Sequence, residues 1–139
     1  MEHNPVYRLI NVLANKQRRN VDQMAFPGKI TPAQARVLHY ILKNAPDEVF
    51  QKDIEEEFAL RPPTATQLLK TMEKNELLRR EPSVRDARFK KIVISQKAKP
   101  YYEPLCQHMD NLEERLGRGI PAEDLEVWKR VSETMIENL

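Results

Sequence analysis

The spacing of apolar residues predicts helices along most of the chain. Positions 6, 9, 10 and 13 follow the period of an amphipathic helix, which we expect to begin near Pro5 and to run into the low twenties, before a Phe-Pro-Gly break at residues 26–28. A second helix is predicted after Thr31, because threonine can cap a helix, Pro32 suits its first turn and Gln34 can complete a capping box. Pro46 should end this helix, and its expected buried stripe is Val37, Leu38, Ile41, Leu42 and Ala45.

Two further helices are predicted close together in the sequence. Ile54 and Phe58 are one turn apart in a short helix whose other side is acidic. Pro62 and Pro63 suit the first turn of the next helix, because amides at that position have no partner within the helix. Two short helices joined by a few residues predict a helix-turn-helix. The second helix should bury Ala65, Leu68, Leu69 and Met72. Its polar residues should lie on the outward face or on the flanks, namely Thr64, Thr66, Gln67, Lys70, Thr71 and Lys74.

After Asn75 and Glu76 the period changes from helical to extended. Residues 77–81 and residues 89–94 are predicted to form two strands, and the polar residues 82–88 between them are too many for a two-residue turn. A basic hairpin directly after a candidate recognition helix is the arrangement of a winged helix. In that arrangement the helix enters the major groove of DNA and the hairpin tip lies near the minor groove.

The C-terminal part is predicted to hold two more helical stretches. Ser95 is expected to cap a long helix, in which Pro100 and Pro104 predict a bend or a late start, and residues 117–121 interrupt it. A winged-helix core of residues 31–95 cannot cover the apolar faces of the terminal helices, so pairing with a second copy is expected. The apolar positions are Tyr101, Tyr102, Leu105, Met109, Leu112 and Leu116, followed by Leu125, Trp128, Val131, Met135 and Leu139.

Composition narrows the class of protein. The chain has 139 residues, which fits one domain, and only three glycines, which argues against a Gly-rich nucleotide loop and against an all-β sandwich or barrel. It contains no run of about 18 apolar residues, so no membrane-spanning helix is expected. Cys106 alone cannot form a disulfide framework. Together with the lack of a charged and then apolar leader, this predicts a cytoplasmic protein.

The charge of the chain is unevenly distributed. Residues 61–99 hold eleven basic and four acidic residues and carry +7, within a formal net charge of only +2. Such a separation gives one face suited to a polyanion, although a solvated surface whose charges cluster by chance is the alternative. The basic residues are Arg61, Lys70, Lys74, Arg79, Arg80, Arg85, Arg88, Lys90, Lys91, Lys97 and Lys99.

Three stretches together carry a family resemblance. Residues 60–74 read LRPPTATQLLKTMEK, Arg79 and Arg80 follow, and residues 86–88 (Asp-Ala-Arg) precede a hydrophobic strand that ends in serine at residues 92–95. This order resembles the MarR family of winged-helix transcriptional regulators over nearly the whole chain, and Asp-Ala-Arg is similar to the family's Asp-x-Arg wing signature. The resemblance implies a homodimer that reads a palindromic operator in double-stranded DNA, one half-site for each winged helix.

The resemblance also implies a domain organisation. We expect one MarR-like domain over residues 1–139, mainly α with a small β-hairpin wing. Residues 1–30 and 96–139 would form the dimerisation helices, and residues 31–95 the winged helix-turn-helix.

Two positions depart from the family's pattern. Glu76 stands where a glycine usually ends the recognition helix, so Asn75 is expected to take the left-handed cap. Arg61 stands where serine or a similar cap is common, which suggests a phosphate contact in place of the usual capping bond.

Ten residues are candidates for DNA contact. Gln67 can pair bidentately with adenine, and threonine offers a hydroxyl and a methyl group to the bases. In the resemblance, Arg88 is similar to the wing arginine of the minor groove, and Asp86 to the residue that shapes the tip and pairs with basic neighbours. A solvated helix end and ordinary tip charges are the alternatives. The candidates are Arg61, Thr64, Thr66, Gln67, Lys70, Lys74, Arg80, Arg85, Asp86 and Arg88.

The sequence shows no nucleophile and base pair, no metal set and no phosphate loop, so no enzyme, metal or cofactor is predicted. His39 and His108 could approach each other, but two histidines without a paired motif make a poor zinc site. Cys106 is expected to be a small buried hydrophobe rather than a thiol sensor. Four tyrosines could line an effector pocket or belong to the core: Tyr7, Tyr40, Tyr101 and Tyr102.

The sequence therefore predicts a homodimeric, sequence-specific DNA-binding transcriptional regulator, a repressor released by a small-molecule effector. The alternative is a winged-helix module that binds protein and not DNA. The basic segment 61–99 favours the first, because a protein-binding winged helix has no need of +7 there.

Overall fold

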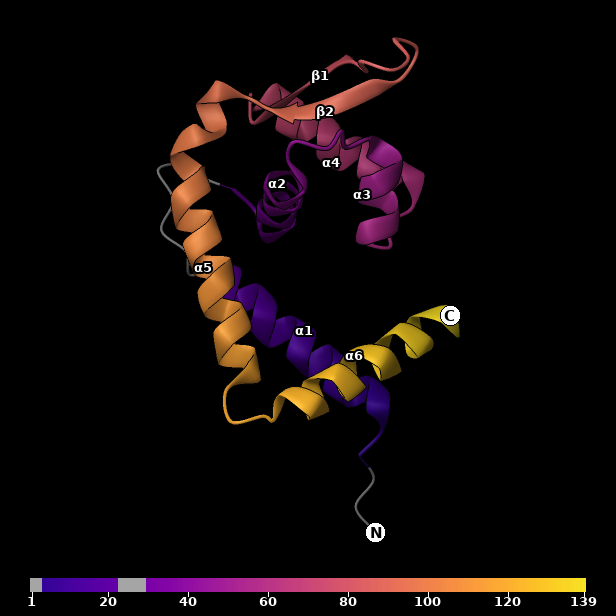
Figure 1. The fold of residues 1–139 in the computed structure, drawn as a ribbon, viewed down its shortest axis with the longest axis vertical. Helices are drawn as coiled ribbons and strands as arrows, with labels where there is room; N and C mark the ends of the chain where they lie inside the picture. The colour runs from indigo at the N-terminus through magenta and orange to yellow at the C-terminus, as the bar shows by residue number, and fades with distance from the viewer. Residues whose placement is uncertain (1–3, 23–29) are drawn as a thin grey trace. The chain divides into compact units, whose positions relative to one another are not determined.

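A computed structural model describes residues 4–22 and 30–139 and confirms a mainly helical chain with one β-hairpin (Figure 1). The expected break at residues 26–28 lies outside the described residues. None of the described helices combines the length and the apolar character that crossing a membrane requires. The elements are α1 (Val6–Asp22), α2 (Pro32–Asn44), α3 (Gln51–Glu57), α4 (Pro62–Lys74), β1 (Leu78–Pro82), β2 (Lys90–Ile94), the 3-10 helix η1 (Gln96–Ala98), α5 (Lys99–Gly117) and α6 (Ala122–Glu137).

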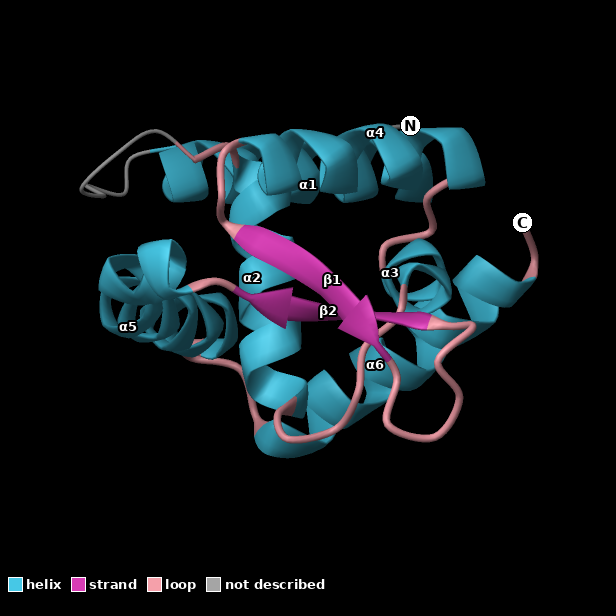
Figure 2. Ribbon diagram, turned by 90° about the horizontal axis from the view of Figure 1, so that it is seen from above, coloured by secondary structure: helices cyan, strands magenta, loops and turns pink. Residues whose placement is uncertain are grey.

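The chain divides into two compact units, Met1–Cys106 and Gln107–Leu139, so that α5 crosses the boundary between them. In the first unit α2 contacts α1, α4 and β2, α3 contacts α4, and α4 contacts β1. Figures 1 and 2 show the hairpin lying against α2 and α4. The largest fully buried side chains of this unit come from α2, α3, α4, β1 and α5, and they are Leu38, Ile54, Leu69, Met72, Leu78, Leu105 and Val37.

Thr31 and Gln34 form the predicted capping box at the start of α2. The Gln34 amide donates to the Thr31 hydroxyl oxygen at 3.2 Å, and the Thr31 amide donates to the Gln34 side-chain oxygen at 3.1 Å. The expectation that Ala45 belongs to the buried stripe is wrong, because α2 ends at Asn44 and Ala45 is exposed in an extended conformation before Pro46.

The hairpin begins one residue later in each strand than the sequence predicts. The Leu77 amide still bonds the helix carbonyl of Met72, so β1 starts at Leu78, and the Phe89 amide bonds Asp86 within the tip, so β2 starts at Lys90. A third segment pairs with this hairpin, because the Ile92 amide donates to the Val49 carbonyl at 2.7 Å. The loop between α2 and α3 is therefore joined to the wing by a backbone hydrogen bond.

The end of α4 differs from expectation. Asn75 has φ −83°, and Glu76, not Asn75, adopts the left-handed conformation with φ 61°. The Glu76 amide donates to Glu73 and the Leu77 amide to Met72, each at 2.9 Å, which is the Schellman pattern. This pattern requires a left-handed residue one position after the C-cap Asn75. Glu76 therefore adopts the left-handed conformation although it is not glycine.

Ser95 sits before η1, but its hydroxyl does not cap that helix. It donates to the Glu76 carbonyl instead, and the Lys97 ammonium donates to the Glu76 carboxylate at 2.7 Å. This bond, with the charge of Lys97, lowers the pKa of Glu76. The turn of 3-10 helix delays α5 to Lys99, which leaves Pro100 in its first turn and Pro104 inside it.

Glu76→Gly is expected to raise the free energy of unfolding by about 1 kcal/mol, because glycine adopts the left-handed conformation without steric cost. The exposed pair with Lys97 contributes little to stability, so its loss should not cancel this gain. Urea denaturation followed by circular dichroism measures the effect. Glu76→Ala is the matched control, since it loses the ion pair and keeps the strain. A glycine variant no more stable than the alanine variant would contradict this account.

The second unit contains the rest of α5 and α6. Leu112 is buried, and Leu125 approaches Gly117 so closely that a Cβ built at the glycine would lie 3.2 Å from its Cδ1 atom. Trp128 and Val131 of α6 are exposed.

Candidate nucleic-acid interface

The fourth helix has one buried and one polar exposed face, as predicted. Ala65, Leu69 and Met72 are fully buried, and Leu68 is half-buried. Arg61 occupies the N-cap position and its side chain makes no capping bond, as expected, whereas its phosphate contact stays a prediction. The exposed candidates on this helix are Thr64, Gln67, Lys70 and Lys74.

Gln51 binds two of the candidates, Thr66 on the flank of α4 and Arg80 on β1. The Gln51 side-chain amide donates to the Thr66 hydroxyl at 2.8 Å and to Glu55 at 3.1 Å. The Arg80 guanidinium donates to the Gln51 oxygen at 3.2 Å and to Glu73 at 3.0 Å, and its side chain is only 28% exposed. These contacts join α3, α4 and β1, so Thr66 and Arg80 fix the recognition helix relative to the wing.

Asp86 shapes the hairpin tip and pairs with its basic neighbour. Its carboxylate accepts from Nε and Nη2 of Arg88, the latter at 2.8 Å, and from the Arg88 backbone amide at 3.1 Å. The bond from the guanidinium lowers the pKa of Asp86. The Arg88 side chain is nevertheless 86% exposed, so its unbonded edge faces solvent.

Every acidic side chain of the basic segment 61–99, all of which is described, is paired with a basic one within it. The pairs are Glu73 with Arg80, Glu76 with Lys97, Glu81 with Arg79, and Asp86 with Arg88. Lys91 lies 3.9 Å from Glu48, outside the segment. The remaining cations of the segment are exposed and form no ion pair with a described residue, namely Arg61, Lys70, Lys74, Arg85, Lys90 and Lys99. The positive charge available to a polyanion therefore lies on α4, the hairpin and the start of α5.

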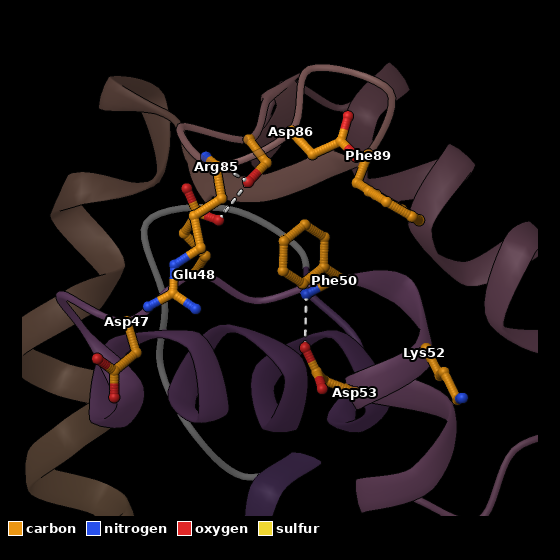
Figure 3. A pocket seen from close by; sticks show the side chains of 9 residues that line it. Asp47, Glu48, Phe50, Lys52, Asp53, Arg85, Asp86 and Phe89 are labelled. Atoms are coloured by element: carbon orange, nitrogen blue, oxygen red, sulfur yellow. Dashed lines mark hydrogen bonds between the residues drawn. The ribbon is translucent and has the colours of Figure 1, made fainter.

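A pocket of about 680 Å³ lies between the α2–α3 loop and the hairpin tip (Figure 3). In its lining the Glu48 carboxylate accepts from the Ser83 hydroxyl at 2.6 Å and from the Val84 amide at 2.9 Å. Sequence reasoning missed Glu48, because 35 residues separate it from Ser83 and no motif links them. The lining residues are Asp47, Glu48, Phe50, Lys52, Asp53, Ser83, Arg85, Asp86 and Phe89.

The other candidate side chains are spread over the fold. Cys106 is half-buried, more open than the buried position expected for it. His39 lies on α2 and His108 on α5, in different units, and the described residues contain no group of three or more His, Cys, Asp or Glu placed to hold a metal. Tyr40 packs edge-on against Phe58, with ring centroids 5.9 Å apart. Tyr7 is exposed, and the Tyr102 hydroxyl donates to the Ser95 carbonyl at 3.3 Å.

The chain is similar to known proteins in sequence and in fold. The model of the MarR family matches residues 29–88. The crystal structure of the transcription regulator MarR from Oenococcus oeni PSU-1 is similar at 29% sequence identity and a TM-score of 0.90, over 96% of this chain and 99% of that chain. No curated protein matches the chain significantly in sequence.

Two structures of S. aureus MepR share the fold at lower identity. The MepR–DNA complex has 22% sequence identity and a TM-score of 0.84, over 96% of both chains. MepR bound to ethidium bromide has 23% identity and a TM-score of 0.58, over 97% of this chain and 96% of that chain.

Proposed function

The chain belongs to the MarR family, and from that premise we propose that it is a homodimeric, sequence-specific DNA-binding transcriptional regulator. We propose further that it is a cytoplasmic repressor released by a small-molecule effector. The MarR family consists of transcription regulators, so the chain is not an enzyme.

One observation carries the DNA-binding proposal. The acidic side chains of residues 61–99 are all paired internally, whereas six exposed cations of this segment have no ion-pair partner among the described residues. Phosphate contacts supply most of the affinity of a protein for DNA, and unpaired exposed cations make those contacts without first breaking an ion pair. S. aureus MepR, which has a similar fold, is found in complex with DNA.

The candidate residues divide into four roles in this proposal. Gln67 and Thr64 on α4 contact base edges in the major groove, and Arg61, Lys70 and Lys74 contact phosphates. Arg85 and Arg88 reach the minor groove, with Asp86 orienting Arg88. Thr66 and Arg80, which Gln51 binds, keep the helix and wing in register.

Dimerisation is proposed to use the terminal helices, residues 1–30 and 96–139, with residues 31–95 as the winged helix-turn-helix of a single domain. The first helix carries an apolar face that remains exposed on the single chain: Val6, Leu9, Ile10 and Leu13. Exposed apolar area of this kind is stabilised by burial against a partner of the same shape.

Release by an effector is supported by fold similarity to MepR, which is found in complex with ethidium bromide. An effector that releases the repressor binds the free dimer more tightly than the DNA-bound dimer. The ratio of these two affinities for the effector equals the factor by which the effector lowers the affinity of the dimer for DNA.

Gln67→Ala is expected to relax the preference for one base pair in each half-site, with a loss of discrimination of about 1–3 kcal/mol, because a bidentate amide contact reads one base. Arg88→Ala is the matched comparison. It should weaken binding to all sequences by a similar factor, because an arginine in the minor groove reads groove width and charge.

The measurement is a titration of each variant, at fixed salt, against a duplex recovered by selection from a random pool and against its single-base variants. If Gln67→Ala lowers every affinity equally, Gln67 is a backbone contact and Thr64 must read the bases.

A further inference from the structure

The Glu48 carboxylate is the side chain that joins the α2–α3 loop to the hairpin tip. One oxygen accepts from the Ser83 hydroxyl at 2.6 Å, and the other accepts from the Val84 amide at 2.9 Å. The same Ser83 hydroxyl oxygen accepts from the Arg85 amide at 3.2 Å. One carboxylate therefore orders three consecutive residues at the point where the chain leaves β1 for the tip.

The surroundings of this contact favour an ionised and well-placed carboxylate. Ser83 is buried, and the Glu48 side chain is only 22% exposed. The bonds from Ser83 and Val84, followed by the charges of Lys91 and Arg85, lower the pKa of Glu48. In Figure 3 the Arg85 side chain extends from the tip toward Glu48 and Asp47.

The backbone beside Glu48 is also joined to the wing. Val49 accepts a hydrogen bond from the Ile92 amide at 2.7 Å, and both residues are buried. This bond holds the middle of β2, whereas Glu48 holds the tip. Within the tip itself, the hydrogen bonds run between neighbouring residues of the hairpin, from Ser83 to Phe89, from Phe89 to Asp86, and from Arg88 to Asp86.

An acidic side chain near a DNA-binding wing is electrostatically unfavourable, because it repels phosphate. Here its two oxygens are bonded to groups of the protein, so it acts on the shape of the tip. We propose that Glu48 is a positioning residue that holds the wing tip, and with it Arg85 and Arg88, in the conformation that enters the minor groove. This inference rests on the proposed DNA-binding function.

The sign of the effect on DNA binding distinguishes this role from a simple surface charge. Glu48→Ala removes both hydrogen bonds and should weaken binding of the selected duplex by about tenfold, the effect of removing roughly one charge-assisted hydrogen bond. Glu48→Gln should be intermediate, because its single carbonyl oxygen replaces only one carboxylate acceptor. An acidic group with no positioning role would give the opposite result, since its removal reduces repulsion of the phosphates.

Asp47 offers a matched control. It is the neighbouring carboxylate of the same pocket, it is exposed, and its side chain makes no hydrogen bond or ion pair with a described residue. Asp47→Ala and Asp47→Asn remove the same charge at nearly the same place without freeing the tip. They should leave binding unchanged or slightly tighter.

A second measurement does not involve DNA. Hydrogen exchange of the Val84 and Arg85 amides, followed by NMR on the full chain, should be faster in Glu48→Ala and unchanged in Asp47→Ala. Only Glu48→Ala removes the acceptor of the Val84 amide and the partner that fixes the Ser83 hydroxyl, to which the Arg85 amide donates. Thermal unfolding of Glu48→Ala identifies a general loss of structure, and the isosteric Glu48→Gln variant then provides the test.

The outcomes are distinguishable. Weaker binding and faster tip exchange in the Glu48 variants, with neither in the Asp47 variants, support the proposal. A wild-type protein that binds no selected duplex overturns the proposed function. A wild-type protein that binds, with Glu48→Ala binding as tightly as Asp47→Ala, overturns the role of Glu48 alone.

Discussion

Raising the salt concentration from 50 to 200 mM is expected to weaken binding of the selected duplex by about 10³-fold or more. Each phosphate that a cation neutralises releases a counterion, and a dimer that neutralises at least six phosphates binds much more weakly as salt rises. Each protomer offers six exposed cations on residues 61–99 without an ion-pair partner among the described residues, including Arg61, Lys70 and Lys74 of α4. Fluorescence anisotropy of a labelled duplex at several salt concentrations gives the slope.

A paired substitution controls for general effects of salt. Lys70→Gln should reduce the slope of log affinity against log salt by about one for each phosphate that the variant no longer neutralises, and so by about two in a dimer. Lys129→Gln is the comparison, because Lys129 lies on α6 and pairs with Glu126 at 3.3 Å. An affinity that hardly changes with salt would favour a winged helix that binds protein.

Leu9→Glu combined with Leu13→Glu is expected to convert the dimer to a monomer at micromolar concentration. These side chains are 46% and 48% exposed on the single chain, and they lie one turn apart on the apolar face of α1. Charges placed there would have to be buried without partners in the dimer. Because the two half-sites are then bound independently, affinity for a palindromic duplex should fall by about 10²-fold or more.

Asn11→Glu combined with Asn15→Glu is the matched control for this change. The two positions have the same spacing on α1, both are exposed and polar, and the added charge is the same. Sedimentation velocity should give a dimer for the control and a monomer for the leucine variant. A leucine variant that remains dimeric would show that α1 does not form the interface.

The sequence predicts the helices and the wing because their signals are local. Thr31, Pro32 and Gln34 lie within four positions of one another, and their capping box forms as expected. The wing follows from a change of period after Glu76. Even here the period does not fix the ends of the elements, since the Leu77 amide still bonds the Met72 carbonyl in the turn after α4 before β1 begins.

Three features that the sequence did not predict depend on contacts between distant residues. Ser95 is a good capping residue by type, but its hydroxyl bonds the carbonyl of Glu76, which the fold brings beside it. Glu48 and Ser83 are far apart in sequence, and neither residue type indicates the other. The sequence does not distinguish Arg80 from the other ten basic residues of the segment, whereas in the structure it is bonded to Gln51 and Glu73. Charge and period thus indicate the proposed interface, whereas the partner of each side chain follows only from the fold.

The most direct test of the central claim is selection of duplexes from a random pool by the full-length protein, followed by titration of the enriched sequence and a scrambled version at one salt concentration. The account predicts an enriched palindrome that binds at least about 10³-fold more tightly than the scrambled duplex, as specific regulators do. Equal affinity for both duplexes, or no enrichment of any sequence, would contradict it.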